Sequence, residues 1–237
     1  MSKAKDISEI ISDANFGGTL DVDGTTNLDV VDIDGTVTVG SNTSDLRFNI
    51  NSANQYPLKF LHAGNTSGHI GGGGSDILRF SNTAGATIME MNAGQITMPL
   101  QPAFMATQVG GTVQSNIANN TTLTFGVERF DNNADFASNT FTAPVTGKYQ
   151  MQFHGRFHAI DTAASWYRIN LVTSNYSYGS MIIDPNFSAD LDYYPFHFTY
   201  LVDMDASDTA TIQFQQSGGT AQTDASEIMF FSGYLVA

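Results

Sequence analysis

The stretch that decides the fold runs from Phe125 to Phe153 and reads FGVERFDNNADFASNTFTAPVTGKYQMQF. It opens as an extended segment that breaks at residues 131–133, Asp-Asn-Asn, because these residues favour turns. A second extended piece carries Phe136 and Phe141. Residues 143–147, Ala-Pro-Val-Thr-Gly, then predict another turn before the pattern becomes regular.

The segment from Lys148 to His158 alternates between two kinds of side chain. A period of two is typical of a strand with one buried face and one exposed face. We therefore expect one long strand here, with an aromatic face turned to the core. The expected buried face carries Tyr149, Met151, Phe153 and Phe157, and the other face carries Gln150, Gln152, His154, Arg156 and His158.

This stretch resembles the signature of the C1q/TNF-like globular domains. The closing segment, residues 230–235 (FFSGYL), is similar to the last strand of that family. The resemblance covers roughly residues 102–237 and implies a ten-strand jelly roll that forms a trimer, binds partners and performs no catalysis. Met151 departs from the Phe that the family usually has. The matching residues are Phe125, Asp131, Phe136, Phe141, Pro144, Gly147, Tyr149 and Phe153.

The composition also indicates a β protein. Hydrophobic residues make up 41% of the 237 residues and charged residues only 14%, with abundant Gly and turn formers. The net charge of −14 argues against a nucleic-acid partner, because no basic patch could neutralise phosphates. The absence of cysteine excludes disulfides and thiol chemistry. Further strands are expected at 103–109, 121–130, 147–160, 165–173, 194–204, 208–216 and 227–236.

Residues 1–15 are the one segment with a helical pattern. Ile7, Ile10 and Ile11 fall on one face, and Asp6 is a suitable N-cap. The segment has no apolar core of a signal peptide, and no apolar run in the chain is long enough for membrane insertion. We expect synthesis in a host cytoplasm and either a frayed terminus, a small three-helix cluster, or a peptide that attaches the chain to other virion proteins.

Residues 16–100 are repetitive and rich in turns. The unit at 21–26, DVDGTT, recurs at 32–37 as DIDGTV, and strands this short bury little surface alone. Three intertwined chains would solve that problem, and the composition resembles the shafts of phage tail fibres. We read the Asp-Gly units as turns rather than calcium loops, because neither supplies the alternating ligands and the closing Glu. Residues 98–102, with two prolines, predict the boundary with a head at 101–237.

No catalytic motif or cofactor-binding loop is found in the sequence. The glycine run at 71–74 lacks the Lys-Ser/Thr of a phosphate loop. His154 and His158 share a strand face but lie about 13 Å apart, so they could hold a metal only by gathering around a threefold axis. We expect no cofactor, no metal and no enzymatic activity.

The stretch from Thr173 to Tyr194 has the most loop-like composition of the head. Tyrosines among Ser, Asn and Asp are typical of adaptable recognition loops, and carboxylates beside aromatic rings suit sugars. Packing of these aromatics in the core or at a trimer interface is the alternative. The candidate ligand-binding residues are Tyr176, Tyr178, Asp184, Asp190, Tyr193 and Tyr194.

Together these features predict an all-β homotrimeric fibre on a phage or virus particle, with a short N-terminal helix, a β shaft and a jelly-roll head. The head would bind a host-surface ligand, with a glycan as the first candidate and a protein as the second. Three alternatives remain: a capsid or collar decoration protein that stabilises the particle, a polysaccharide depolymerase with a carboxylate site between chains, and a bacterial surface or spore-coat protein with a C1q-like head.

Overall fold

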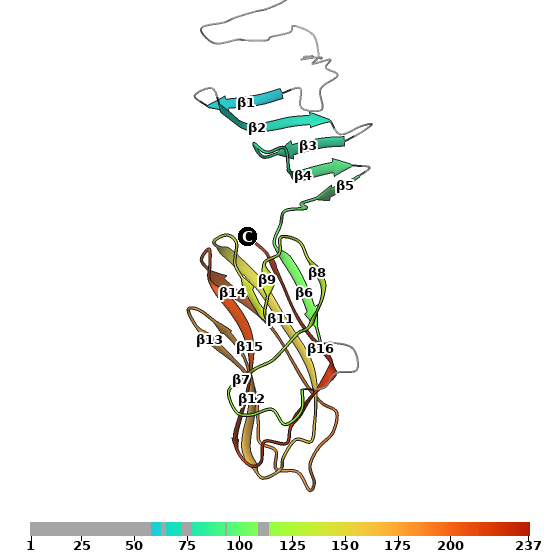
Figure 1. Ribbon diagram of the computed structural model, residues 1–237, viewed down its shortest axis with the longest axis vertical. Coiled ribbons are helices and arrows are strands. Elements are labelled where there is room, and N and C mark those ends of the chain that lie inside the picture. The colour runs from blue at the N-terminus through green and yellow to red at the C-terminus, as the bar shows by residue number, and fades with distance from the viewer. Residues whose placement is uncertain (1–57, 63–64, 73–76, 93, 109–113) are drawn as a thin grey trace, which may run out of the picture. The chain divides into compact units, whose positions relative to one another are not determined.

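The computed structural model describes residues 58–62, 65–72, 77–92, 94–108 and 114–237 (Figure 1). The predicted helix at 1–15 and the repeats at 21–37 lie outside the described residues. All regular structure in the described part is β-strand, as predicted. In these residues no helix is long and apolar enough to cross a membrane.

The head consists of two antiparallel sheets, which we call the first and the second head sheet. The first has the order β14-β11-β16-β6-β8, and the second has the order β13-β12-β15-β10-β9, with β7 also paired to β15. The first contains β6 (Ala103–Thr107), β8 (Val127–Asp131), β11 (Gly147–His158), β14 (Tyr194–Met204) and β16 (Asp224–Leu235). The second contains β9 (Phe136–Ala137), β10 (Thr140–Thr142), β12 (Ala164–Thr173), β13 (Ser177–Ile183) and β15 (Thr209–Gly218), and β7 is Thr121–Thr122.

The path of the chain makes these sheets a jelly roll. After β6 the chain crosses to the second sheet for the short β7 and returns for β8. It then crosses to β9 and β10, returns for β11, crosses for β12 and β13, and alternates through β14, β15 and β16. Such crossing connections between two packed antiparallel sheets define the jelly-roll architecture. The predicted jelly roll is therefore confirmed, with eleven strands, β6 to β16, where ten were expected.

The core between the two head sheets is aromatic. The Phe104 ring stacks on Phe136 at 5.0 Å and on Phe141 at 4.7 Å, and meets Phe231 edge-on at 5.0 Å between ring centres. These rings come from both sheets, so one side chain joins β6 to β9, β10 and β16. The alternation predicted for β11 is also confirmed: its apolar side chains are fully buried and its polar ones are not.

Turn chemistry explains where the early strands break. The Asp131 carboxylate accepts hydrogen bonds from the backbone N–H groups of Asp135 (3.0 Å) and Phe136 (2.8 Å), which fixes the predicted turn. The β9–β10 hairpin has a two-residue loop, and both Ser138 (φ 51°) and Asn139 (φ 67°) are left-handed. This is the geometry that suits the twist of paired strands.

Two predicted segments differ from the structure. Residues 121–130, predicted as one strand, form β7 and β8 in different sheets, because the chain between them has no strand pairing. Residues 173–194, predicted as loop, contain strand β13, which pairs with β12. Polar composition hid this edge strand, whose Tyr178 packs against the core.

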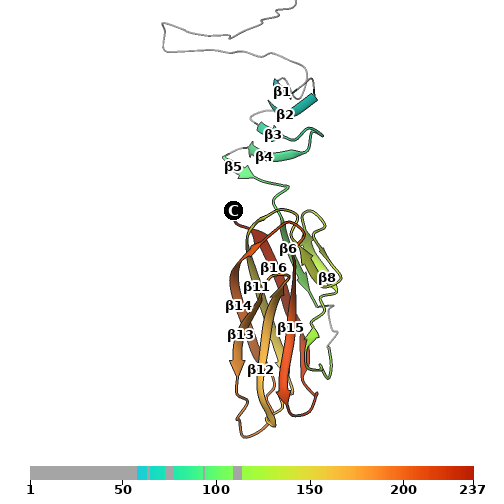
Figure 2. The same cartoon turned by 90° about the vertical axis from the view of Figure 1, so that its left-hand side faces the viewer.

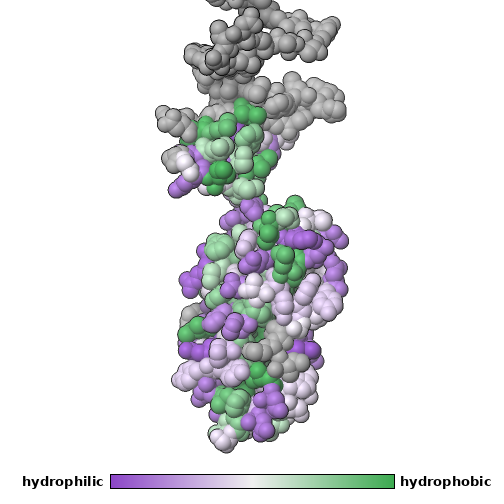
Figure 3. Space-filling view, turned by 180° about the vertical axis from the view of Figure 1, so that it is seen from behind, coloured by the Kyte–Doolittle hydropathy of each residue, from purple (hydrophilic) through white to green (hydrophobic). Residues whose placement is uncertain are grey.

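Residues 58–97 form an antiparallel meander in which each strand pairs with the next. The register places Ile70, Phe80 and Met89 on one face, together with Leu78, Met91 and Ile96. The opposite face carries Arg79 and Glu90, which form an ion pair at 2.5 Å. Hydrophobic residues are visible on the strands that precede the head (Figure 3). The strands are β1 (Leu58–His62), β2 (Asn65–Gly72), β3 (Ile77–Ser81), β4 (Thr87–Asn92) and β5 (Gln95–Thr97).

Candidate functional site

The four predicted tyrosines fall into two groups, one beside the middle of β14 and one at its start. The first group surrounds β13. Tyr176 is 64% exposed, and its ring centre lies 4.9 Å from that of Tyr178. Tyr178 is half-buried, and its ring packs against Tyr200 in a tilted arrangement with ring centres 5.5 Å apart. The Tyr200 hydroxyl donates a hydrogen bond to the Gly179 carbonyl, so this group connects β14 of the first head sheet to β13 of the second.

The second group lies at the start of β14. Tyr193 is 64% exposed with a left-handed φ of 61°. Its ring receives the Arg156 guanidinium at 5.1 Å and the edge of the His158 ring at 4.7 Å. Tyr194 is half-buried and packs on Phe196 at 5.3 Å. Tyr193 is therefore the predicted ligand residue of this group that presents its ring to solvent.

Asp190 has a structural connection that the sequence did not predict. Its carboxylate accepts hydrogen bonds from the Thr162 backbone N–H (3.0 Å), the Gln222 amide (2.7 Å) and the Thr162 hydroxyl (3.0 Å). These donors favour the charged form and hold the pKa of the Asp190 carboxyl below its usual value. Asp190 thus ties together two turns at one end of the head, whereas Asp184 is exposed between them and β13.

The six predicted residues do not form one site. Tyr200, which carries the first group, is six residues from Tyr194 along a strand, a separation of about 20 Å. A ligand the size of a single sugar could therefore contact one group at a time.

The two histidines predicted as threefold-axis candidates both lie on the outer face of the first head sheet. His154 stacks on Phe230 with ring centres 5.3 Å apart, and His158 Nδ1 lies 3.7 Å from the Asp192 carboxylate. The structure adds His197, which is the direct cross-strand partner of His154. The alternation of residues in β14 could have predicted that His197 points outward, but only the strand register shows that it lies beside His154. Within the described part of a single chain, no cluster of three or more His, Cys, Asp or Glu could hold a metal.

The outer face of the first head sheet also leaves large apolar side chains uncovered. Phe130 and Tyr234 are 47% and 46% exposed, and Leu201 is 59% exposed. A shallow cavity of about 290 Å³ lies among Met105, Phe130 and Tyr234, with Gln150 at its rim. This mixture of apolar centre and amide rim is typical of a surface that packs against another protein.

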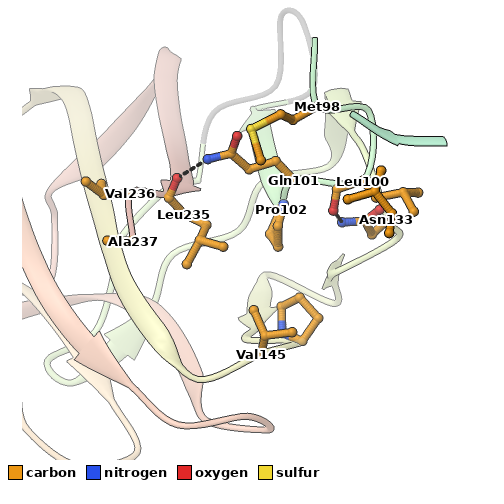
Figure 4. A pocket seen from close by; sticks show the side chains of 11 residues that line it. Met98, Leu100, Gln101, Pro102, Asn133, Val145, Leu235, Val236 and Ala237 are labelled. Atoms are coloured by element: carbon orange, nitrogen blue, oxygen red, sulfur yellow. Dashed lines mark hydrogen bonds between the residues drawn. The ribbon is translucent and has the colours of Figure 1, made fainter. Parts of the chain in front are cut away.

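A larger apolar cavity of about 520 Å³ lies where residues 98–102 enter the head (Figure 4). Met98, Leu100 and Val145 are among its lining residues, and the Gln101 amide donates to the Leu235 carbonyl at 2.6 Å. None of its described lining residues is acidic, basic or nucleophilic. The cavity can accept apolar groups but supplies no side chain for acid–base or covalent catalysis.

The head is similar in structure to two solved proteins. The globular domain of zebrafish complement 1qA protein is 18% identical, covers 58% of this chain and 98% of its own chain, and has a TM-score of 0.42. Murine APRIL is 9% identical, covers 57% of this chain and 99% of its own chain, and has a TM-score of 0.38. No protein-family model and no curated protein sequence matches the chain.

Proposed function

We propose that this chain is a homotrimeric, non-enzymatic fibre protein of a phage or virus particle, whose head binds a ligand on the host surface. The observation that carries the proposal is the apolar face of the meander, on which Leu78, Met91 and Ile96 are exposed. A sheet face that gathers large apolar side chains in solvent is unstable alone and prone to pair. Copies of the same chain, each presenting the same face, would bury all of them around one axis.

The exposed fractions of three side chains on this face give the size of the stabilisation that burial between chains would contribute. Leu78 and Met91 are 40% exposed and Ile96 is 64% exposed in the single chain. Fully burying one such side chain contributes about 1.5 to 3 kcal/mol, so burying what remains exposed of these three adds about 2 to 4 kcal/mol per chain. A symmetric assembly multiplies that gain by the number of chains.

Three is the number of chains that the C1q/TNF-like resemblance of the sequence implies. The uncovered apolar side chains of the first head sheet, among them Phe130, Leu201 and Tyr234, would supply the contact between heads. In this arrangement His154 and His197 of each chain would also lie at or near the contact. The shaft and the head would then both contribute to assembly.

The placement of the carboxylates supports a binding role rather than catalysis. Asp131 and Asp190 accept hydrogen bonds from backbone N–H groups, and buried Asp161 accepts from the backbone N–H of Ala163 at 2.7 Å. Carboxylates used in this way stabilise turns. A glycosidase instead needs two carboxyl groups facing each other across the scissile bond, one with a raised pKa. Burial raises the pKa of the Asp135 carboxyl, but the backbone N–H of Asp135 donates to the Asp131 carboxylate, so these two carboxyl groups belong to one turn.

The test is the solution mass of the full chain, measured by light scattering after size exclusion, followed by binding to candidate host cells. Three copies that bind cells without releasing reducing sugar support the proposal. Sugar release would favour the depolymerase alternative, and a trimer that binds no cells would favour the decoration role. A monomer at micromolar concentration refutes the fibre.

A further inference from the structure

A strip of polar and aromatic side chains lies on the outer face of the second head sheet. It follows β12 and β15, which run side by side along the head (Figure 2). On β12 the outward positions alternate with Tyr167 and Ile169, which are buried in the core. We call it the amide strip, and its members are Trp166, Arg168 and Asn170 on β12, Gln213 and Gln215 on β15, and Asn120 just before β7.

Hydrogen bonds within the strip fix the direction of its side chains. The Gln215 amide nitrogen donates to Asn120 Oδ1 at 2.7 Å and to Gln213 Oε1 at 3.0 Å. The Gln215 oxygen accepts from Arg168 Nε at 2.9 Å and from Arg168 Nη2. The guanidinium is therefore held in one orientation by a neutral partner, with its carbon 5.5 Å from the centre of the Trp166 ring.

Among the described residues Arg168 has no acidic partner, and it shares this with Arg129. The protein has 9 Lys and Arg against 23 Asp and Glu, so carboxylates are available to most cations. Arg168 nevertheless takes part in none of the ion pairs found among the described residues. A guanidinium carries five N–H donors, and the strip uses two of them. The remaining donors can bind an anionic oxygen group.

Asn170 adds a second, independent sign of a missing partner. Its side chain is fully buried, and neither its amide oxygen nor its amide nitrogen has a hydrogen-bond partner. A buried, unpaired amide costs about 1 to 3 kcal/mol and is rare in native proteins. Asn170 lies opposite Gln213 on one side and Gly179 on the other.

We infer that the amide strip binds an acidic polysaccharide whose sugar units carry carboxylate groups. The inference rests on the proposed function, because it names the chemical class of the ligand that the head binds. The Arg168 guanidinium pairs with the carboxylate through two parallel N–H groups, which is the geometry that Arg favours. Trp166 packs against the apolar face of a sugar ring. Asn170 gains a missing partner when a ligand hydroxyl group displaces the side chains that cover it, while Arg168 keeps its bonds to Gln215.

The chemistry of the strip favours a sugar over an acidic peptide. Amide groups offer both donors and acceptors, as sugar hydroxyls do, and Trp166 offers a ring for the apolar face of a sugar, whereas the side chains of an acidic peptide such as polyglutamate have acceptors only and no such face. The net charge of −14 gives no general attraction for polyanions, so binding must depend on Arg168 itself. Selectivity for a carboxylated sugar over the matching neutral sugar follows from that one contact.

The experiment uses the full-length chain and the fluorescence of Trp166, the only tryptophan in the sequence. Galacturonic acid oligomers, galactose oligomers of the same length and polyglutamate are titrated separately. Only the galacturonic acid oligomers are expected to give a saturable change. Arg168→Gln keeps an amide beside Gln215 but removes the charge, and should weaken binding about 10-fold or more. Arg129→Gln, an exposed arginine on the first head sheet, is the matched control and should bind as the parent chain does.

Three results would overturn the inference. Equal responses to neutral and acidic sugars would remove the role of the carboxylate, and an equal response to polyglutamate would remove the role of the sugar. Unchanged affinity in both Arg168→Gln and Arg168→Lys would remove the role of the guanidinium, provided that circular dichroism shows both variants folded. The mass of the same samples separates this inference from the proposed function, because a trimer that ignores all three ligands refutes only the amide strip.

Discussion

Replacing Met91 with glutamate tests whether the apolar face of the meander is buried between chains. Met91 is flanked on this face by Leu78 and Ile96, which pair with it in the sheet. In an assembled shaft the new carboxylate would leave water, at a cost of several kcal/mol per ion, and symmetry would bring the introduced charges together. That cost exceeds the 2 to 4 kcal/mol per chain that burial of the three side chains contributes.

The control is Asn92→Glu, which places the same charge one residue away on the polar face of the same strand. Asn92 pairs with Ile77 and is exposed, so this change should alter stability by about 0.5 kcal/mol or less. Amide hydrogen exchange in β3–β5, measured with the solution mass, reports on the shaft even if the heads stay associated. Met91→Glu should remove exchange protection from these strands and Asn92→Glu should not. Equal protection in both variants would show that the apolar face is not an interface.

Three further changes test the head. Phe104→Ala should lower the free energy of unfolding by about 4 kcal/mol, because it removes the ring that packs against Phe136 and Phe141. The control is Phe187→Ala, which should cost about 1 kcal/mol or less because that ring is 42% exposed. Chemical denaturation measures both values. Asn170→Leu should leave the melting temperature unchanged or raise it, since no hydrogen bond is lost, while weakening acidic-sugar binding. Asp190→Asn should make the loss of stability below about pH 4 less steep. Because the pKa of Asp190 is lowered in the folded protein, its contribution to stability is present above the unfolded-state pKa and disappears as the pH falls through the folded-state pKa. The same dependence of stability on acid pH in the variant and the parent chain would contradict this.

The sequence predicted those parts of the head in which local pattern and tertiary environment agree. Tyr149, Met151 and Phe153 alternate with polar residues, and the strand that carries them is buried on the predicted side. The turn at Asp131 was predictable because a short carboxylate side chain can bond to the backbone that follows it. The resemblance to the C1q/TNF-like domains supplied the jelly-roll architecture, which composition alone could not, although it implied ten strands and the head has eleven.

Prediction failed where a residue's environment depends on strand register. Residues 177–183 look like a loop by composition, but they form the edge strand β13 because β12 offers a free edge and Tyr178 reaches the core. The β9–β10 hairpin turns at Ser138 and Asn139 without the Asn-Gly or Asp-Gly pair that marks such turns. His197 and the amide strip were likewise out of reach, since each is assembled by residues that are neighbours across strands and distant in sequence.

The outer faces of the two head sheets suit different partners, and in the proposed function this difference would separate assembly from recognition. The first sheet exposes Phe130, Leu201 and Tyr234, whose burial is favourable against any complementary apolar surface, including another copy of the chain. The second sheet carries a partly exposed network of neutral amides around Arg168, which has no acidic partner among the described residues. This network gains little from apolar contact and would lose hydrogen bonds to water if covered by protein. Trimer formation through the first sheet would therefore leave the amide strip in solvent on every chain. Three such strips on one particle-bound fibre would engage a repetitive polysaccharide together, so that weak single contacts combine into avid attachment.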